Sequence, residues 1–169
     1  MTTSFDSTST SSVAPQVSTA DLYDEHGDTL QSVTTQFISF GGRTSFHGPA
    51  RTLRSYEDNL LLKELVASDG AGGVLVVDGG GSLRCALLGD NMARRALDNG
   101  WSGLVILGAV RDRDQLARLD IGVKALGTNP RRSRKKGEGT VDDVVTIGEA
   151  EIRPGAHLYC DTDGILVER

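Results

Sequence analysis

The sequence predicts an α/β protein with a mixed sheet whose central portion is parallel. Two observations indicate this class. In the middle of the chain, short apolar runs at 74–79 and 103–108 read as buried strands, with an amphipathic stretch at 90–101 between them. On either side, 36–55 and 140–169 are short β-prone pieces separated by turn residues. A parallel strand-helix-strand centre with antiparallel additions follows.

The chain has 169 residues, enough for one sizeable core but short for two. Its first 18 residues, MTTSFDSTSTSSVAPQVS, are mostly Ser and Thr, so ordering them would not recover the entropy cost. We expect a disordered tail over 1–18 and a single domain over 19–169. There is no secretory-signal pattern and no apolar run long enough to span a bilayer, so we expect a soluble, cytoplasmic protein without membrane contact.

Two helices are expected before the first buried strand. The segment STADLYDEHG has Ser18 or Thr19 as its N-cap, acidic residues in its first turns and Gly27 as its stop. In YEDNLLLKELVASDGAGG, Asp58 is the expected cap and glycines end the helix. Its apolar face consists of leucines at helical spacing: Leu61, Leu62 and Leu65.

Strands are expected around these helices. From 36 to 55, β-prone pieces are broken at Gly41–Gly42 and at Gly48–Pro49. SLRCALLG at 82–89 reads as a strand that follows three glycines, and GVKALGT at 122–128 as a further strand. The C-terminal third predicts four short strands: DDVVTIG, AEIRPG, HLYCDTDG and ILVER.

The first candidate site segment is Gly89–Asp90–Asn91–Met92, where the chain leaves a strand and enters the helix DNMARRALDNGW. Backbone N–H groups and the positive end of the helix dipole face outward at such a junction, which suits a carboxylate ligand. Asp90 or Asn91 is expected to start this helix. Its apolar face is formed by Met92, Ala93, Ala96 and Leu97.

A second junction of the same kind is Arg111–Asp112, between the strand GLVILGAV and the helical turns of RDRDQLARLD. Neighbouring strand ends of this type line one crevice in open α/β sheets, so Arg111 and Asp112 are expected to face Asp90. A lone aspartate with water ligands suits Mg²⁺ or Mn²⁺, and arginine can fork two hydrogen bonds onto a carboxylate. The alternative is that Asp90 and Asp112 are helix caps and Arg111 a surface salt-bridge partner.

The glycines Gly79–Gly80–Gly81 match no phosphate-binding loop, because no Gly-Lys-Ser/Thr follows, and no dinucleotide fingerprint, because Arg84 takes the third glycine's place. VLVVDGGGS has the look of a methyltransferase motif, but a strand rather than a helix is expected after it. The competing interpretation is a turn that sits close under a neighbouring segment.

Other features of the sequence limit the classes of function that this protein can have. The net charge of −5 argues against direct nucleic-acid binding. Cys85 and Cys160 match no metal-ligand spacing and read as reduced core thiols, and none of His26, His47 and His157 belongs to a ligand pattern. One basic run, NPRRSRKKGEG, is a solvated loop or a contact for an anionic partner or substrate; its charged residues are Arg131, Arg132, Arg134, Lys135 and Lys136.

The chain resembles the RraA-like family in several separate motifs that occur in the right order, from about Thr19 to Val167. They are Asp90 with Arg111–Asp112 after twenty intervening residues, FGGRTSFHGP, VLVVDGGGS, DIGVKALGTNPR and DTDGILV. The family includes regulators of ribonuclease E and class II 4-hydroxy-4-methyl-2-oxoglutarate aldolases, and some members were once labelled demethylmenaquinone methyltransferases. The resemblance implies a swivelling β/β/α domain and a ring-shaped homotrimer.

The resemblance also implies residue roles. Gly89, Asp90, Asn91 and Met92 match the substrate-binding segment, Arg111 the substrate-contacting arginine and catalytic residue, and Asp112 the metal-binding aspartate. The implied reaction is metal-dependent cleavage of a 2-oxo acid, in which a divalent cation stabilises the pyruvate enolate. Loss of carbon dioxide from oxaloacetate gives the same enolate, so a secondary decarboxylase activity is implied.

One position departs from the family pattern. Efficient aldolases of the family have an acid three residues after the metal-binding aspartate, where this chain has Gln115. Asp114 would point roughly 100° away on a helix. The chain therefore resembles both branches, and the alternative to a lyase is a non-catalytic protein that binds and inhibits ribonuclease E.

Overall fold

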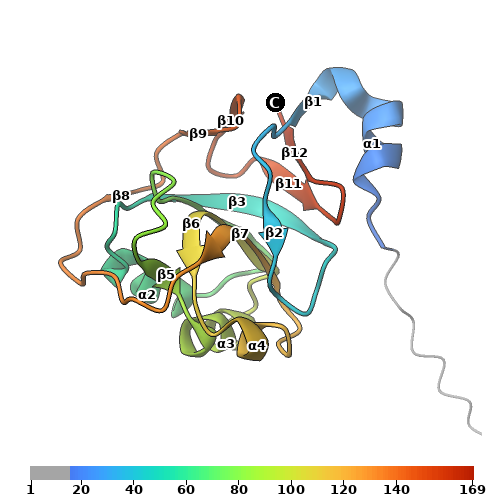
Figure 1. The fold of residues 1–169 in the computed structure, drawn as a ribbon. Helices are drawn as coiled ribbons and strands as arrows, with labels where there is room; N and C mark the ends of the chain where they lie inside the picture. Colours follow the sequence, from blue (N-terminus) through green and yellow to red (C-terminus); the bar gives the residue numbers. More distant parts are fainter. Residues whose placement is uncertain (1–15) are drawn as a thin grey trace, which may run out of the picture.

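The protein's computed structural model describes residues 16–169, traced in Figure 1. Residues 1–15, which hold most of the expected tail, lie outside the described residues. The helices are α1 (Thr19–His26), η1 (Gly27–Thr29, a 3-10 turn), α2 (Leu60–Val66), α3 (Asp90–Asp98) and α4 (Arg113–Leu116). The first strands are β1 (Leu30–Ser32), β2 (Ile38–Ser39), β3 (Phe46–Arg54), β4 (Val74–Asp78), β5 (Ala86–Leu88) and β6 (Gly103–Val110). The later strands are β7 (Gly122–Thr128), β8 (Thr140–Val141), β9 (Val145–Ile147), β10 (Ala150–Ile152), β11 (His157–Cys160) and β12 (Ile165–Glu168).

Within residues 16–169, ten strands form one mixed sheet in the order β1-β12-β11-β3-β4-β6-β7-β2, with β5 beside β6 and β8 beside β3. The centre is parallel, since β3 pairs with β4, β4 with β6, and β6 with both β5 and β7. The outer pairs are antiparallel, and β9 and β10 form a separate antiparallel pair. The predicted α/β class with a parallel central portion is confirmed.

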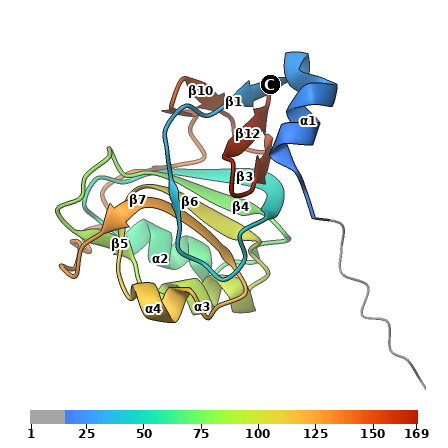
Figure 2. The same cartoon turned by 45° about the vertical axis from the view of Figure 1, so that its right-hand side comes forward.

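The central strands are covered on both faces, which explains their apolar runs. Figure 2 shows α2, α3 and α4 below these strands and β1, β10 and β12 above them. On β4, Leu75 and Val77 belong to the core that faces the helices, while Val74 and Val76 belong to the core shared with the C-terminal strands. Because side chains alternate along a strand, burial on both faces requires an unbroken apolar run. The result is two β layers and one helix layer, as expected.

The helix starts follow the capping signals with one shift. Ser18 caps α1, because its hydroxyl accepts the Asp21 N–H at 3.3 Å. In α2 the N-cap position is Asn59, and Asp58 acts from one residue earlier by accepting the Leu60 N–H at 3.1 Å. The α3 helix begins at Asp90, as expected. Its N-cap is Gly89, so Asp90 is not a cap and this helix start has no capping side chain of its own.

The expected break at Gly48–Pro49 is wrong, because β3 runs through it from Phe46 to Arg54. Gly48 and Pro49 are the last positions at which β3 faces β11, and parallel pairing with β4 begins at Ala50. Proline lacks an N–H, so it is tolerated where a strand changes partners. The carbonyl of Gly72 lies against Gly48, where a side chain would collide with it.

The expected strand at 82–89 is shorter than its pattern, because only Ala86–Leu88 pairs with β6.

Cys85, just before β5, and Cys160, on β11, are both free and buried, which confirms the interpretation as core thiols. Burial raises the pKa of both thiols, so they stay protonated. No helix within residues 16–169 is long and apolar enough to cross a membrane.

Candidate functional site

The two strand-to-helix junctions predicted from the sequence lie side by side. Leu88 at the end of β5 is paired with Val110 at the end of β6, and the Arg111 N–H donates to the Leu88 carbonyl at 2.9 Å. The Asp112 carboxylate then reaches the start of α3, where its Oδ2 accepts the Asp90 N–H at 3.1 Å. The structure thus joins the two segments at the carboxyl edge of the parallel strands.

Gly89 makes room for this contact. A Cβ atom at position 89 would lie 2.7 Å from Oδ2 of Asp112 and 3.5 Å from Cγ and Nε of Arg111. The backbone at Gly89 is extended, so its requirement for glycine comes from space rather than from a left-handed conformation. A larger residue would displace the Asp112 carboxylate.

Asp112 has a backbone conformation that non-glycine residues rarely adopt, with φ 60° and ψ 43°. It occupies the N-cap position of α4, yet its side chain makes no capping bond to that helix. The carboxylate instead faces α3, so the interpretation of Asp112 as a cap of its own helix is wrong. Such strain in a residue beside a cavity is typical of functional positions.

Arg111 is half-buried and lines a cavity of about 370 Å³ at this edge of the sheet. Its Nη1 donates to the Pro130 carbonyl at 3.4 Å. Among the ion pairs formed within residues 16–169, none includes Arg111, so the salt-bridge interpretation is wrong for this part of the chain. The remaining donors of its guanidinium can serve a ligand in the cavity.

Asn91 and Met92 are placed differently from Gly89 and Asp90. Asn91 is exposed, and its N–H donates to Oδ1 of Asp90 at 2.8 Å. The Met92 side chain packs against the helix-side core, and its sulfur accepts from Nδ2 of Asn59 at 3.6 Å. Any contact between Met92 and a ligand at this edge would therefore come from its backbone.

The expected divalent cation has one direct ligand candidate here. Within residues 16–169, no three His, Cys, Asp or Glu side chains cluster as a metal site. Asp112 uses Oδ2 for the Asp90 N–H, which leaves Oδ1 for a ligand. Mg²⁺ keeps several waters and needs only one or two carboxylates, whereas zinc prefers a fuller set of His and Cys ligands. The donor set fits Mg²⁺ or Mn²⁺ with water and substrate oxygens.

Some residues of the cavity were not identified from the sequence. Arg113, Thr128 and Asn129 line it together with Pro130. The Arg113 guanidinium lies 5.0 Å from the centre of the Phe40 ring. Asn129 follows β7, whose carboxyl end adjoins that of β6, so the strand-end rule that selected Arg111 could also have selected it.

The glycine loop after β4 forms a packed turn. Gly80 and Gly81 have positive φ angles of 69° and 75°, and the Tyr56 ring lies over Gly80. Gly79 is buried against the Leu107 carbonyl, where a side chain would not fit. The next element after these glycines is the strand β5 and not a helix, which favours the close-turn interpretation over a cofactor loop.

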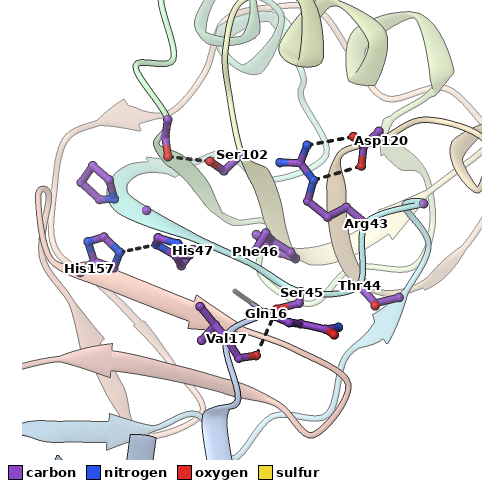
Figure 3. Close-up of a pocket in the computed structure, with 14 residues that line it drawn as sticks. Gln16, Val17, Arg43, Thr44, Ser45, Phe46, His47, Ser102, Asp120 and His157 are labelled. Atoms are coloured by element: carbon purple, nitrogen blue, oxygen red, sulfur yellow. Dashed lines mark hydrogen bonds and ion pairs between the residues drawn. The ribbon is translucent and has the colours of Figure 1, made fainter. Parts of the chain in front are cut away.

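A larger cavity of about 810 Å³ lies elsewhere in the fold (Figure 3). Arg43 is bound there to Asp120 by two hydrogen bonds of 3.1 Å, and Nδ1 of His47 lies 2.9 Å from Nε2 of His157. Ser102 and Asp120 precede β6 and β7, so this cavity is at the amino ends of the parallel strands. Ligands of open α/β sheets bind at the carboxyl ends, which favours the smaller cavity at Arg111 and Asp112.

The fold and the edge site together define an α/β protein with a cavity where parallel strands end. The RraA-like family model, described as Aldolase/RraA, matches residues 19–167, and the chain belongs to this family. The recognised family and the predicted fold class are thereby confirmed.

Three of the similar proteins carry three different names. A Pseudomonas syringae protein named "Putative 4-hydroxy-4-methyl-2-oxoglutarate aldolase" is 53% identical over 88% of this chain and 92% of its own length. A Thermus thermophilus structure, described as that of the RNA-processing inhibitor RraA, has a TM-score of 0.88 and 46% identity, over 91% of this chain and 93% of its own. A Geobacillus kaustophilus structure, described as that of a 2-dimethylmenaquinone methyltransferase, has a TM-score of 0.89 and 43% identity, over 90% and 94%.

Proposed function

We propose that this protein is a divalent-metal-dependent aldolase that cleaves 4-hydroxy-4-methyl-2-oxoglutarate into two molecules of pyruvate. The observation that carries the proposal is the contact of the Asp112 carboxylate with the start of α3 beside Arg111. The carboxylate and the arginine line one cavity beside the start of α3, and this arrangement supports binding of a divalent cation and an anionic substrate. The name of the Pseudomonas syringae relative supports the same reaction.

Each residue has a distinct task in this proposal. Asp112 holds the divalent cation, which supplies Lewis-acid polarisation of the 2-oxo acid. Arg111 binds the substrate carboxylate and the oxygen that gains negative charge as the carbon–carbon bond breaks. Gly89 leaves room for the Asp112 carboxylate, and the Asp90 N–H fixes the position of that carboxylate.

Proton transfer is the weak point of the site. Cleavage requires the 4-hydroxyl to lose its proton, and an amide such as Gln115 cannot accept one. Gln115 and Asp114 are both exposed on α4. We propose that the proton leaves through water, so turnover is slow, and that oxaloacetate, whose decarboxylation needs no such base, is a second substrate.

Pyruvate release from both substrates tests the proposal, with Mg²⁺ or Mn²⁺ and again with a chelator. We expect metal-dependent release that is lost in Asp112→Ala. Asp114→Ala is the matched control, because it removes an exposed carboxylate two residues away and should retain activity. Release that persists with the chelator, or in Asp112→Ala, would overturn the metal-dependent lyase.

A second candidate function is a non-catalytic regulator that binds and inhibits ribonuclease E. Gln115 favours it, because the site lacks the acid of efficient aldolases, and so does the similarity to the Thermus thermophilus RNA-processing inhibitor. This function predicts a complex with the nuclease that survives co-purification at physiological salt and is unaffected by Asp112→Ala. Absence of such a complex would discard it.

We also propose a homotrimer, on the family resemblance and on the many short strands whose edges a partner can cover. Light scattering should give about three times the chain mass of 17.9 kDa.

A methyltransferase function, which the name of the Geobacillus kaustophilus protein suggests, has less support because the glycine loop forms a packed turn. Titration with S-adenosylmethionine should therefore show no binding.

A further inference from the structure

Hydrogen bonds to its backbone groups hold the basic run at 131–136 in place. The Asp58 side chain is fully buried and accepts the Lys136 N–H at 2.7 Å and the Gly137 N–H at 3.1 Å. Burial opposes ionisation of Asp58, but the backbone N–H groups outweigh it and keep its pKa below the usual value. The loop is thus anchored by a charged, buried carboxylate.

Further backbone bonds fix the middle of the run. The Asn59 N–H donates to the Arg134 carbonyl and the Arg134 N–H to the Glu57 carbonyl, both at 2.9 Å. The Ala86 N–H donates to the Arg131 carbonyl at 2.8 Å. The arginine side chains therefore start from fixed positions rather than from a free loop.

A cavity of about 240 Å³ lies beside this fixed backbone. The residues that line it include four arginines and one acid: Arg84, Arg131, Arg132, Arg134 and Glu57, with Cys85 and Ser133. Glu57 is bound by Arg84, whose Nε and Nη2 donate to it at 2.7 Å and 2.8 Å. The other three arginines enter no ion pair within residues 16–169, so the cavity carries excess positive charge.

Ser133 gives a second, independent sign of a ligand. Its exposed fraction is 9%, and its hydroxyl has no hydrogen-bond partner within residues 16–169. A buried polar group without a partner is costly, and such groups are rare in folded proteins. An oxyanion in the cavity would accept the hydrogen bond that this hydroxyl offers.

The electrostatics at Cys85 agree with this arrangement of arginines. Burial and the charge of Glu57 raise the pKa of this thiol, while Arg131, Arg134 and Arg84 each oppose the rise. Four arginines around one small cavity favour a compact ligand with more than one negative charge over an extended partner.

We propose that this cavity binds a phosphate group, either as inorganic phosphate or as the end of a small phosphomonoester. A phosphate dianion offers several acceptor oxygens to guanidinium forks and to the Ser133 hydroxyl together. A carboxylate would leave part of this donor set unused. The site is separate from the Arg111–Asp112 cavity, and it is tested by binding alone, whether or not the protein is a lyase.

Calorimetric titration with inorganic phosphate at constant ionic strength tests the proposal. We expect saturable binding that falls about 10-fold or more in Arg134→Gln and about 10-fold in Ser133→Ala, because hydrogen bonds to charged groups are lost. Arg118→Gln, which removes an exposed arginine outside the cavity, is the matched control and should bind as the unaltered protein does. Circular dichroism verifies folding, and Arg131→Gln replaces any variant that unfolds.

Methyl phosphate identifies the source of the phosphate group. Tighter binding than inorganic phosphate supports a phosphomonoester, and weaker binding supports the free ion. The proposal is overturned if phosphate gives no saturable binding at millimolar concentration, if acetate binds equally well, or if Arg118→Gln weakens binding as much as Arg134→Gln. Binding of single-stranded RNA without binding of phosphate would also overturn it.

Discussion

The Asp112 carboxylate crosses from the end of β6 to the start of α3, and Gly89 provides the space. In Gly89→Ala the new methyl group would press on Oδ2 of Asp112, 2.7 Å away, and weaken its hydrogen bond to the Asp90 N–H. We expect the metal-dependent kcat/KM for pyruvate release to fall by about 10-fold or more, because a misplaced ligand reduces rate strongly. Urea unfolding should show a loss of only about 1 kcal/mol.

Gly127→Ala is the control for this substitution. Its added Cβ would meet only a Leu83 methyl group, at an ordinary 3.6 Å. It should keep both activity and stability. Unchanged kcat/KM in Gly89→Ala would show that the carboxylate position does not matter for the reaction.

Asp58 is expected to be a large single contributor to stability. In Asp58→Ala, the N–H groups of Leu60, Lys136 and Gly137 lose their acceptor inside the protein. The free energy of unfolding should fall by about 3 kcal/mol or more, since each buried unsatisfied donor costs about 1–3 kcal/mol. Urea denaturation measures the loss. Asp143→Ala, at an exposed position, should change it by less than about 0.5 kcal/mol, and equal effects would contradict the role of Asp58.

At the scale of elements, β3 packs against the central strands β6 and β7 through the aromatic ring of Phe46. The Phe46 ring covers Gly103 on β6 and Gly122 on β7, and a methyl group on either glycine would overlap it. Gly122→Ala should therefore lower the free energy of unfolding by about 2 kcal/mol, as overpacking does. In a Phe46→Leu background, with its smaller side chain, the same substitution should cost less than half as much. A double-mutant cycle by urea unfolding measures this coupling, and simple additivity would contradict it.

The elements that the sequence predicted are those with local signals. The apolar runs of β4, β6 and β7 and the spacing of α2 and α3 depend on neighbouring residues only. β1 and β8 were not predicted, because strands of three and two residues form only when distant partners set their register. The break expected at Gly48–Pro49 failed for the same reason, since β11 and β4 decide the path of β3.

The candidate site shows the same contrast between features with local sequence signals and features that depend on distant contacts. The strand-end rule brought Asp90, Arg111 and Asp112 together from sequence alone, because both junctions are locally recognisable. The anchoring of the basic run was not predictable, since Asp58 binds the Lys136 N–H across 78 positions of the sequence. No local pattern marks such a contact, and only the folded chain reveals that Ser133 is buried without a partner.

Across the whole molecule, ionised carboxylates connect segments far apart in the chain. Asp161 accepts the N–H and the hydroxyl of Thr19, both at 2.7 Å, which ties the start of α1 to the turn between β11 and β12. Arg43 holds Asp120, and Arg84 holds Glu57. These contacts keep the pKa of each carboxyl below its ordinary value, although burial opposes the shift at Asp161.

The direction of these shifts predicts acid-sensitive stability. Bonding to Arg84 and Ser82 lowers the pKa of Glu57 from 4.5 to about 2. Above pH 4.5 this carboxyl is ionised in both states and its stabilisation is complete. Below that pH the unfolded chain takes up the proton first, so stabilisation is lost progressively until about pH 2. Asp120 and Asp161 act in the same direction from the ordinary aspartate value of 3.8 downward.

We therefore expect Tm to change little between neutral pH and the ordinary glutamate pKa of 4.5, and to fall steeply below it. Circular dichroism melting in a pH series measures the profile. Glu57→Gln should start from a lower Tm and lose less on acidification, because an amide has no proton to gain in this range. Glu151→Gln, at an exposed pair with Arg153, is the matched control and should retain the full acid sensitivity. If Glu57→Gln and the unaltered protein lost Tm in parallel, the Glu57–Arg84 contact would not be a source of the pH dependence.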